Sequence, residues 1–129
     1  MNKNTWLLVA ILIIASFLRL YNLIPVNNIG LPPGLYPDEA MNGNNAVEAL
    51  ETGVWKVFYP ENFGREGLFI NVQSLFVAVF GNQAWALRLP SAIFGILTVL
   101  GVYFFTKPLF HGDERLARLA SFLLAVSFW

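Results

Sequence analysis

The sequence predicts an all-α integral membrane protein, and two observations carry that prediction. Of the 129 residues, 57% are hydrophobic and only 12% are charged, whereas soluble domains are about one quarter charged. The mean hydropathy is +0.59, and long apolar runs alternate with polar stretches, so the bilayer is the expected solvent. The last run, residues 117–129, stops without a polar tail, and we therefore expect the N-terminal part of a larger multi-spanning protein.

Charge and cysteine content exclude several classes of function. Eight basic and eight acidic residues give a formal net charge of zero, so the charge balance gives no reason to expect a nucleic-acid partner. The chain contains no cysteine. Disulfide scaffolds, cysteine-ligated zinc, iron–sulfur clusters and thiol nucleophiles are therefore excluded.

The first predicted membrane span covers residues 6–24. Residues 6–18 carry no charge, and apolar character resumes after Arg19. The resulting segment of about 19 residues suits a spanning helix of about 20 residues. A cleaved signal peptide with Lys3 as its basic region is the alternative, but no small-x-small cleavage site follows.

A polar outer loop is predicted over residues 25–88, because prolines, glycines, asparagines and most of the acidic residues gather there. Apolar residues recur at near-helical spacing until Gly53, which predicts a short helix over about 38–52. A second helix is predicted over about 67–80. Since it is too short to span, we expect it to lie in the interface or to re-enter the membrane.

The second predicted span covers residues 89–105, with Pro90 in its first turn. A turn over residues 106–116 then leads to the start of a third span at 117–129. Basic residues favour the cytoplasmic side, and they lie before the first span and after the second (Lys3, Lys107, Arg115, Arg118). We therefore expect a protein of the cell membrane whose N-terminus is cytoplasmic and whose loop over residues 25–88 is extracytoplasmic.

Arg19 and Arg88 stand at the outer ends of the two spans, against that bias. Taken singly, each arginine is expected to snorkel to the interface. Together with Arg65 and the acidic pair Asp38-Glu39, they could form a polar cleft for an anionic lipid headgroup, with a carboxylate acting as a base. Asp38 is also a good N-cap for the helix over about 38–52, and the two roles are compatible.

Four motifs in order carry a resemblance to a known family: Phe17-Leu18-Arg19-Leu20-Tyr21, Pro37-Asp38-Glu39-Ala40, Gly64-Arg65-Glu66-Gly67-Leu68-Phe69 and Ala86-Leu87-Arg88-Leu89-Pro90-Ser91-Ala92. The chain resembles the start of the GT-C superfamily of polyprenyl-phosphate-sugar glycosyltransferases, in the protein-mannosyltransferase and aminoarabinose-transferase-like branch. The resemblance implies a multi-spanning GT-C-like helical bundle whose first outer loop carries the catalytic acid and two membrane-parallel helices.

The resemblance also implies a reaction: inverting transfer of a sugar from a polyprenyl-phosphate-linked donor to a hydroxyl of a protein, lipid or glycan acceptor, on the extracytoplasmic face. It implies that Asp38 is the general base and that Glu39 supports it or helps to bind the acceptor. Three arginines would bind the donor phosphate (Arg19, Arg65, Arg88). Fixed cations there would stabilise the charge that the phosphate gains as it leaves.

Glu66 departs from the commoner Lys-Pro-Pro-Leu form of the loop motif. It could be a second acidic group near the donor, a metal ligand or a salt-bridge partner of Arg65. The resemblance leaves a divalent cation open as a cofactor and implies no other.

Two further readings bear on the same loop. Its aromatic residues (Trp55, Phe58, Tyr59, Phe63) could stack on a sugar or line a lipid path, but an interfacial aromatic belt is the stronger expectation. The alternative function is that of a non-catalytic transporter or membrane scaffold, in which the loop is structural and the arginines are anchors. A transporter built from inverted repeats is not indicated, because the chain contains no visible internal repeat.

Overall fold

The computed structural model describes residues 3–21, 23, 35–61 and 63–127. These residues are mostly helical, as predicted, and their elements follow the chain in this order: α1 (Lys3–Leu20), α2 (Pro37–Thr52), β1 (Phe58–Tyr59), β2 (Arg65–Glu66), α3 (Gly67–Phe80), α4 (Ala84–Leu109) and α5 (Glu114–Val126). Contacts divide the chain into two compact units. We call residues 22–90 the loop unit and residues 1–21 with 91–129 the three-helix unit.

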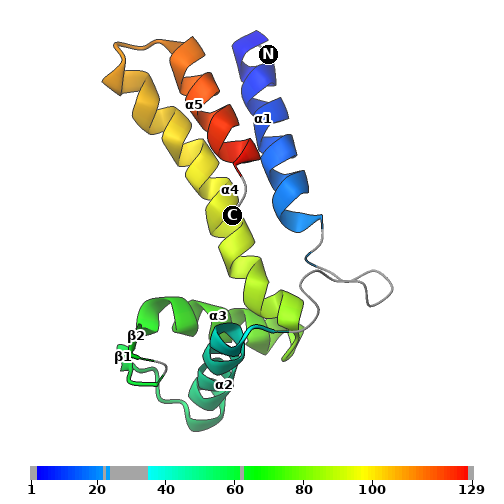
Figure 1. The fold of residues 1–129 in the computed structure, drawn as a ribbon, viewed down its shortest axis with the longest axis vertical. Coiled ribbons are helices and arrows are strands. Elements are labelled where there is room, and N and C mark those ends of the chain that lie inside the picture. Colours follow the sequence, from blue (N-terminus) through cyan, green and yellow to red (C-terminus); the bar gives the residue numbers. More distant parts are fainter. Residues whose placement is uncertain (1–2, 22, 24–34, 62, 128–129) are drawn as a thin grey trace. The chain divides into compact units, whose positions relative to one another are not determined.

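Helices α2 and α3 pack against each other in the loop unit (Figure 1). Their shared core consists of buried side chains from α2, β1, α3 and the first turn of α4 (Ala46, Tyr59, Ile70, Val77, Leu87). The predicted helix over 67–80 is confirmed at both ends by α3. The predicted helix over about 38–52 is confirmed to within one residue by α2, whose C-cap Gly53 is in the left-handed conformation, with φ of 68°.

The start of α2 corrects the predicted role of Asp38 as the N-cap. The N-cap is Tyr36, whose backbone is extended, and Pro37 is the first helical residue. Proline suits that position because its fixed φ matches the helix and its missing N–H would have no partner there. Asp38 and Glu39 therefore lie inside the first turn.

A two-stranded antiparallel hairpin, β1 with β2, was not predicted. Phe58 pairs with Glu66 and Tyr59 pairs with Arg65. The hairpin meets the start of α3 at Gly67, whose N–H donates to the carbonyl of Val57 (2.7 Å). A Cβ on Gly67 would overlap the Lys56 carbonyl oxygen, so glycine is required at this close approach.

Helix α4 is the one helix among the described residues that is long and apolar enough to cross a membrane. It extends beyond the predicted 89–105 at both ends, so the prediction that Pro90 lies in the first turn is wrong. Proline is tolerated in the second turn because it removes a single bond, the one to the carbonyl of Ala86.

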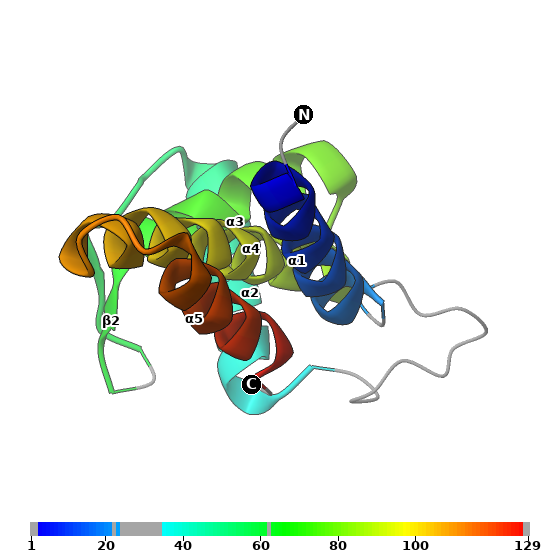
Figure 2. The same ribbon diagram turned by 90° about the horizontal axis from the view of Figure 1, so that it is seen from above.

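The three-helix unit contains α1, α5 and the part of α4 from Ser91 onward. Both views show α1 and α5 side by side (Figures 1 and 2), and the core between the helices is built from Ile11, Ala15, Val99 and Ala125. Small side chains at the contact let the helices approach closely.

Two boundaries in this unit differ from the predictions. Helix α5 begins at Glu114 rather than near residue 117, because Asp113 caps it: Asp113 Oδ1 accepts from the backbone N–H groups of Arg115 (2.7 Å) and Leu116 (3.2 Å). The turn before α5 is accordingly shorter than the predicted 106–116. Residues 22 and 24 of the predicted first span, residues 25–34 of the loop and residues 128–129 of the third span lie outside the described residues, as does the side chain of Lys3.

Candidate functional site

The first turn of α2 holds the two predicted acidic residues. Their carboxylates lie at the positive end of the helix dipole, which favours their ionised forms. Glu39 is fixed further because its Oε2 accepts from the backbone N–H of Tyr36, at 3.2 Å. This bond is the half of a capping box that returns from the third helical residue to the N-cap.

Glu39 forms a two-point ion pair with Arg88, near the start of α4. Arg88 Nε donates to Glu39 Oε1 (3.0 Å), and Nη2 donates to Oε2 (2.7 Å). Such a fork fixes orientation as well as charge. The Arg88 hydrogen bond, helped by the Tyr36 N–H and opposed by partial burial, lowers the pKa of Glu39 below its ordinary value of 4.5. Glu39 is therefore ionised at neutral pH.

Gly43 explains how α2 comes close enough to α4 for this pair to form. A Cβ on Gly43 would come within 2.8 Å of Leu87 Cδ1. Gly43 lies one turn after Glu39, and Leu87 directly precedes Arg88, so the close contact and the ion pair lie on neighbouring turns. The missing side chain thus brings the acid within reach of its arginine.

Asp38 pairs with Arg65 on strand β2, at 3.1 Å between Oδ2 and Nη2. The hairpin aims Arg65 inward, on the same face as its strand partner Tyr59, which is fully buried. Asp38 is the more open carboxylate of the two, since its side chain is 66% exposed against 32% for Glu39. Arg65 Nε is shielded from solvent and has no hydrogen-bond partner among the described residues.

The structure thus brings together four of the six predicted site residues: Asp38, Glu39, Arg65 and Arg88. Glu66 is exposed and precedes α3 as its N-cap residue. The expectation that Glu66 could be the salt-bridge partner of Arg65 is wrong, because that partner is Asp38.

Arg19 has a different environment, in the three-helix unit. Its guanidinium donates to the main-chain carbonyls of Leu124 and Ala125, both at 3.2 Å, near the end of α5. It passes close to Gly95 of α4, where a Cβ would come within 2.7 Å of Arg19 Nε. A role for Arg19 at the donor phosphate stays a prediction.

Gln73 supports the site and was not predicted. It is buried, and its Nε2 donates to the carbonyl of Leu87 (2.8 Å). The residue after Leu87 is Arg88, so Gln73 anchors α3 to the turn that carries the arginine. One feature of the sequence could have indicated this role. Gln73 is a polar residue within the apolar run over 67–80, where a polar side chain is expected to have a specific partner.

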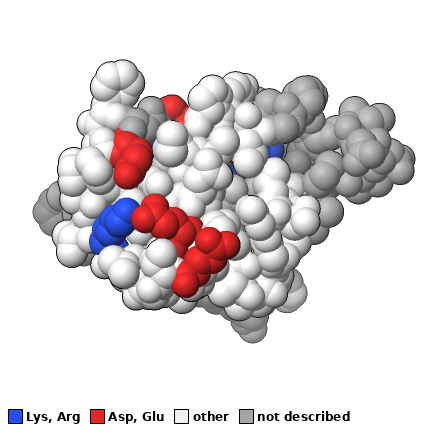
Figure 3. Space-filling model, turned by 90° about the horizontal axis from the view of Figure 1, so that it is seen from below, with Lys and Arg blue, Asp and Glu red and all other residues white. Residues whose placement is uncertain are grey.

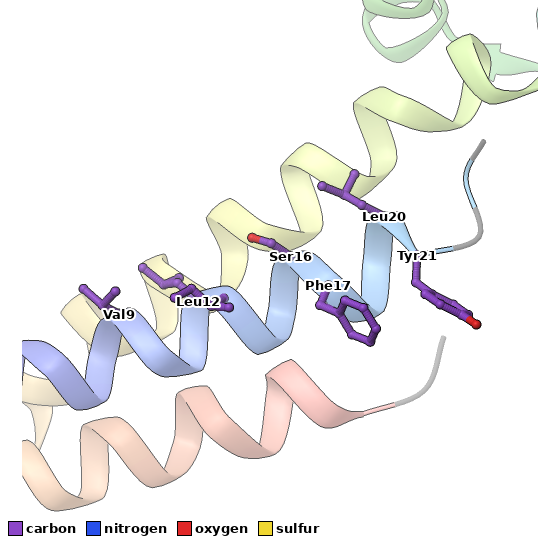
Figure 4. A pocket seen from close by; sticks show the side chains of 7 residues that line it. Val9, Leu12, Ser16, Phe17, Leu20 and Tyr21 are labelled. Atoms are coloured by element: carbon purple, nitrogen blue, oxygen red, sulfur yellow. The ribbon is translucent and has the colours of Figure 1, made fainter.

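We also searched the rest of the described surface for groups of charged or metal-binding side chains. Acidic side chains gather beside a basic one on the face drawn in Figure 3, which is otherwise largely uncharged. No group of three or more His, Cys, Asp or Glu side chains in the described parts of the chain could hold a metal ion. An apolar groove of about 540 Å³ runs along α1 (Figure 4) and is lined by Val9, Leu12, Ile13, Ser16, Phe17, Leu20 and Tyr21. Its lining contains no carboxylate, histidine, lysine or arginine.

Comparison with known protein families gives a match over the second half of the chain. Residues 68–129 match the family described as dolichyl-phosphate-mannose-protein mannosyltransferase. The matched residues include Arg88, but they begin after Asp38, Glu39 and Arg65.

A particular relative extends the likeness toward the N-terminus. The chain is 27% identical over 128 residues to "Putative mannosyltransferase YkcB" of Bacillus subtilis (strain 168). The alignment covers 92% of this chain and 16% of that relative's length. No solved structure matches the chain. The predicted resemblance to protein mannosyltransferases is thereby confirmed.

Proposed function

We propose that the chain is the N-terminal part of a multi-spanning GT-C-like membrane glycosyltransferase. The enzyme transfers a sugar from a polyprenyl-phosphate-linked donor to an acceptor hydroxyl on the extracytoplasmic face, with inversion at the anomeric carbon. The observation that carries the proposal is the convergence of two carboxylates and two arginines at the first turn of α2. The matching family and the similar protein are both named as mannosyltransferases, so mannose is the first sugar to test.

The two carboxylates divide the work. Asp38 is the general base, because it is the more exposed and can reach an acceptor hydroxyl. As the acceptor oxygen bonds to the anomeric carbon, its proton passes to Asp38. Glu39, held by two bonds from Arg88 and with a lowered pKa, is a poor base. Its role is to fix the arginine.

The arginines serve the leaving group. When the bond between the anomeric carbon and the phosphate oxygen breaks, the polyprenyl phosphate gains negative charge, which fixed cations stabilise. The Arg65 side chain is 32% exposed, and a donor phosphate would compete with Asp38 for its outer nitrogens. A phosphate that takes up the Arg65 guanidinium would break the ion pair with Asp38 and leave that carboxylate to accept the proton of the acceptor hydroxyl.

The test is sugar transfer by the Asp38→Asn variant of the full-length protein, with radiolabelled polyprenyl-phosphate sugars in membranes. Asparagine keeps the size of the side chain but cannot take the proton, so we expect a loss of about 10²–10⁴-fold. Glu48→Gln is the matched control: Glu48 lies on the same helix in an exposed pair with Lys56, at 2.8 Å, and transfer should be unchanged.

Two results would contradict the proposal. Normal transfer by Asp38→Asn would show that Asp38 is not the general base. Transfer from a nucleotide sugar would show that the donor is not a polyprenyl-phosphate-linked sugar. Running each assay with and without a divalent cation tests whether the reaction uses one. The transporter or scaffold alternative predicts no transfer by the unmodified protein from any donor.

A further inference from the structure

The β1–β2 hairpin has two faces of opposite character. Neighbouring residues on a strand point to opposite faces, so Tyr59 and Arg65 share the inner face while Phe58 and Glu66 share the outer one. Tyr59 is fully buried, and its hydroxyl donates to Asn71 Oδ1 at 3.0 Å, whereas the Phe58 side chain is 59% exposed. The aromatic residues of this loop therefore do not form one set.

The outer edge of the hairpin is apolar and open. Phe63 is fully exposed, and its backbone is left-handed, with φ of 67°, a costly conformation for an aromatic residue that persists only where something requires it. The ring of Phe58 lies against Gly64, where a Cβ would come within 2.7 Å of Phe58 Cζ. Val57 and Leu68 are 89% and 78% exposed. We call Val57, Phe58, Phe63 and Leu68 the hairpin edge.

Helix α3 continues this surface with inverted polarity. Its polar residues point inward: Gln73 and Ser74 are buried, and Asn71 Nδ2 donates to the Lys56 carbonyl at 3.1 Å. Its exposed residues are apolar, including Leu75 and Val79. A helix on a water-facing surface shows the reverse pattern, so the exposed face of α3 suits an apolar environment.

We propose that the hairpin edge inserts into the surface of a lipid bilayer and anchors the loop unit there. Two observations favour lipid as the occupant. The exposed side chains of α3 are apolar, and residues 81–83 connect α3 to α4, the helix among the described residues that is long and apolar enough to cross a membrane. Aromatic side chains are favoured at that depth. Three charged groups lie near the edge. Glu66 would sit at the level of the headgroups, Lys56 is turned toward Glu48 of α2, and Glu61, between β1 and β2, is partly buried.

The test places a nitroxide label at Phe63→Cys in the full-length protein, reconstituted in phosphatidylcholine vesicles. This chain has no cysteine, and any cysteine elsewhere in the protein is replaced by serine. We expect collisions with oxygen to exceed those with a water-soluble nickel chelate at this site. Glu51→Cys, at an exposed position in the last turn of α2, is the matched control and should show the reverse.

Val57→Cys provides a second position on the same edge and should report the same phase as Phe63→Cys. A label at both positions that is as open to the nickel chelate as the label at Glu51→Cys would overturn the proposal. An immobile label that neither reagent reaches would also overturn it, because a protein partner or a second copy would then cover the edge. The outcome is independent of sugar transfer, which can fail while the edge stays in lipid.

Discussion

Arg19 in the three-helix unit and the two arginines Arg65 and Arg88 in the loop unit have different kinds of partner. In the loop unit, Arg65 and Arg88 contact carboxylates of the first turn of α2. In the three-helix unit, Arg19 contacts main-chain carbonyls near the end of α5. A carboxylate can take a proton and can be replaced by another anion, whereas a carbonyl does neither at ordinary pH. The contacts of Arg65 and Arg88 are therefore ones that chemistry can exchange, whereas those of Arg19 are not. The ion pair of Arg118 with Glu114 in the three-helix unit is of the exchangeable kind, but it lies within α5.

The largest effect is expected at Gly67→Ala, in the loop unit. A Cβ would overlap the Lys56 carbonyl oxygen, so the hairpin must move away from α3. We expect destabilisation at the upper end of the about 1–3 kcal/mol that overpacking costs. Hydrogen exchange would show faster exchange at the Gly67 amide and along α3. Gly53→Ala is the control for loss of a glycine, since a Cβ there meets nothing within 4 Å, although its positive φ adds some strain. Equal effects would contradict the close contact.

Glu39→Gln should have the next largest effect. It removes the negative charge from the fork that holds Arg88, whose side chain is only 19% exposed. We expect a loss of about 1–3 kcal/mol in the free energy of unfolding, measured by thermal unfolding in detergent. Glu48→Gln breaks an exposed ion pair and should cost at most about 1 kcal/mol. If the two variants are equally stable, the Glu39–Arg88 fork is not a structural contact.

The three-helix unit offers a paired test within α4. Gly95→Ala would press on Arg19 Nε and Cδ and displace the guanidinium from the carbonyls of α5, whereas at Gly101 a Cβ meets nothing within 4 Å. Alanine is the better helix former, so Gly101→Ala should stabilise by about 0.5–1 kcal/mol. Gly95→Ala should be about 1 kcal/mol less stable than Gly101→Ala, because the arginine hydrogen bonds are strained. Indistinguishable melting temperatures would show that Arg19 adapts freely.

The smallest effect concerns pH. Because the pKa of Glu39 is lowered in the folded state, the stability that its ion pair adds is present above the ordinary pKa of 4.5 and is lost as the pH falls through the folded value. Unfolding measured between about pH 5 and pH 3 should therefore show a steeper loss for the unmodified protein than for Glu39→Gln. Parallel curves would mean that Glu39 titrates normally.

The sequence predicted what local patterns control. The limits of α3 were read correctly because a glycine precedes its apolar run and Gly81-Asn82 closes it. Helix α4 begins at Ala84, before the predicted residue 89, so Pro90 lies in its second turn rather than its first. Proline costs only one main-chain bond in a second turn, and burial of the neighbouring Leu87 outweighs that loss.

The partners within the site could not be predicted in the same way. Glu39 and Arg88 are 49 positions apart, and nothing local to either residue specifies their pairing. The family resemblance gathered the charged residues, but it assigned the arginines to the donor rather than to the acids. The hairpin was missed because each strand has two residues, too few for an alternating pattern to show.

Those two-residue strands have a consequence for insertions and deletions. Only the register of Tyr59 with Arg65 and Phe58 with Glu66 decides which charge faces Asp38. A shift by a single position reverses the two faces of a strand. One added residue in the turn between β1 and β2 would thus present the carboxylate of Glu66 to Asp38 in place of the Arg65 guanidinium and turn an attraction into a repulsion. The length of this turn therefore sets the sign of the charge at the site.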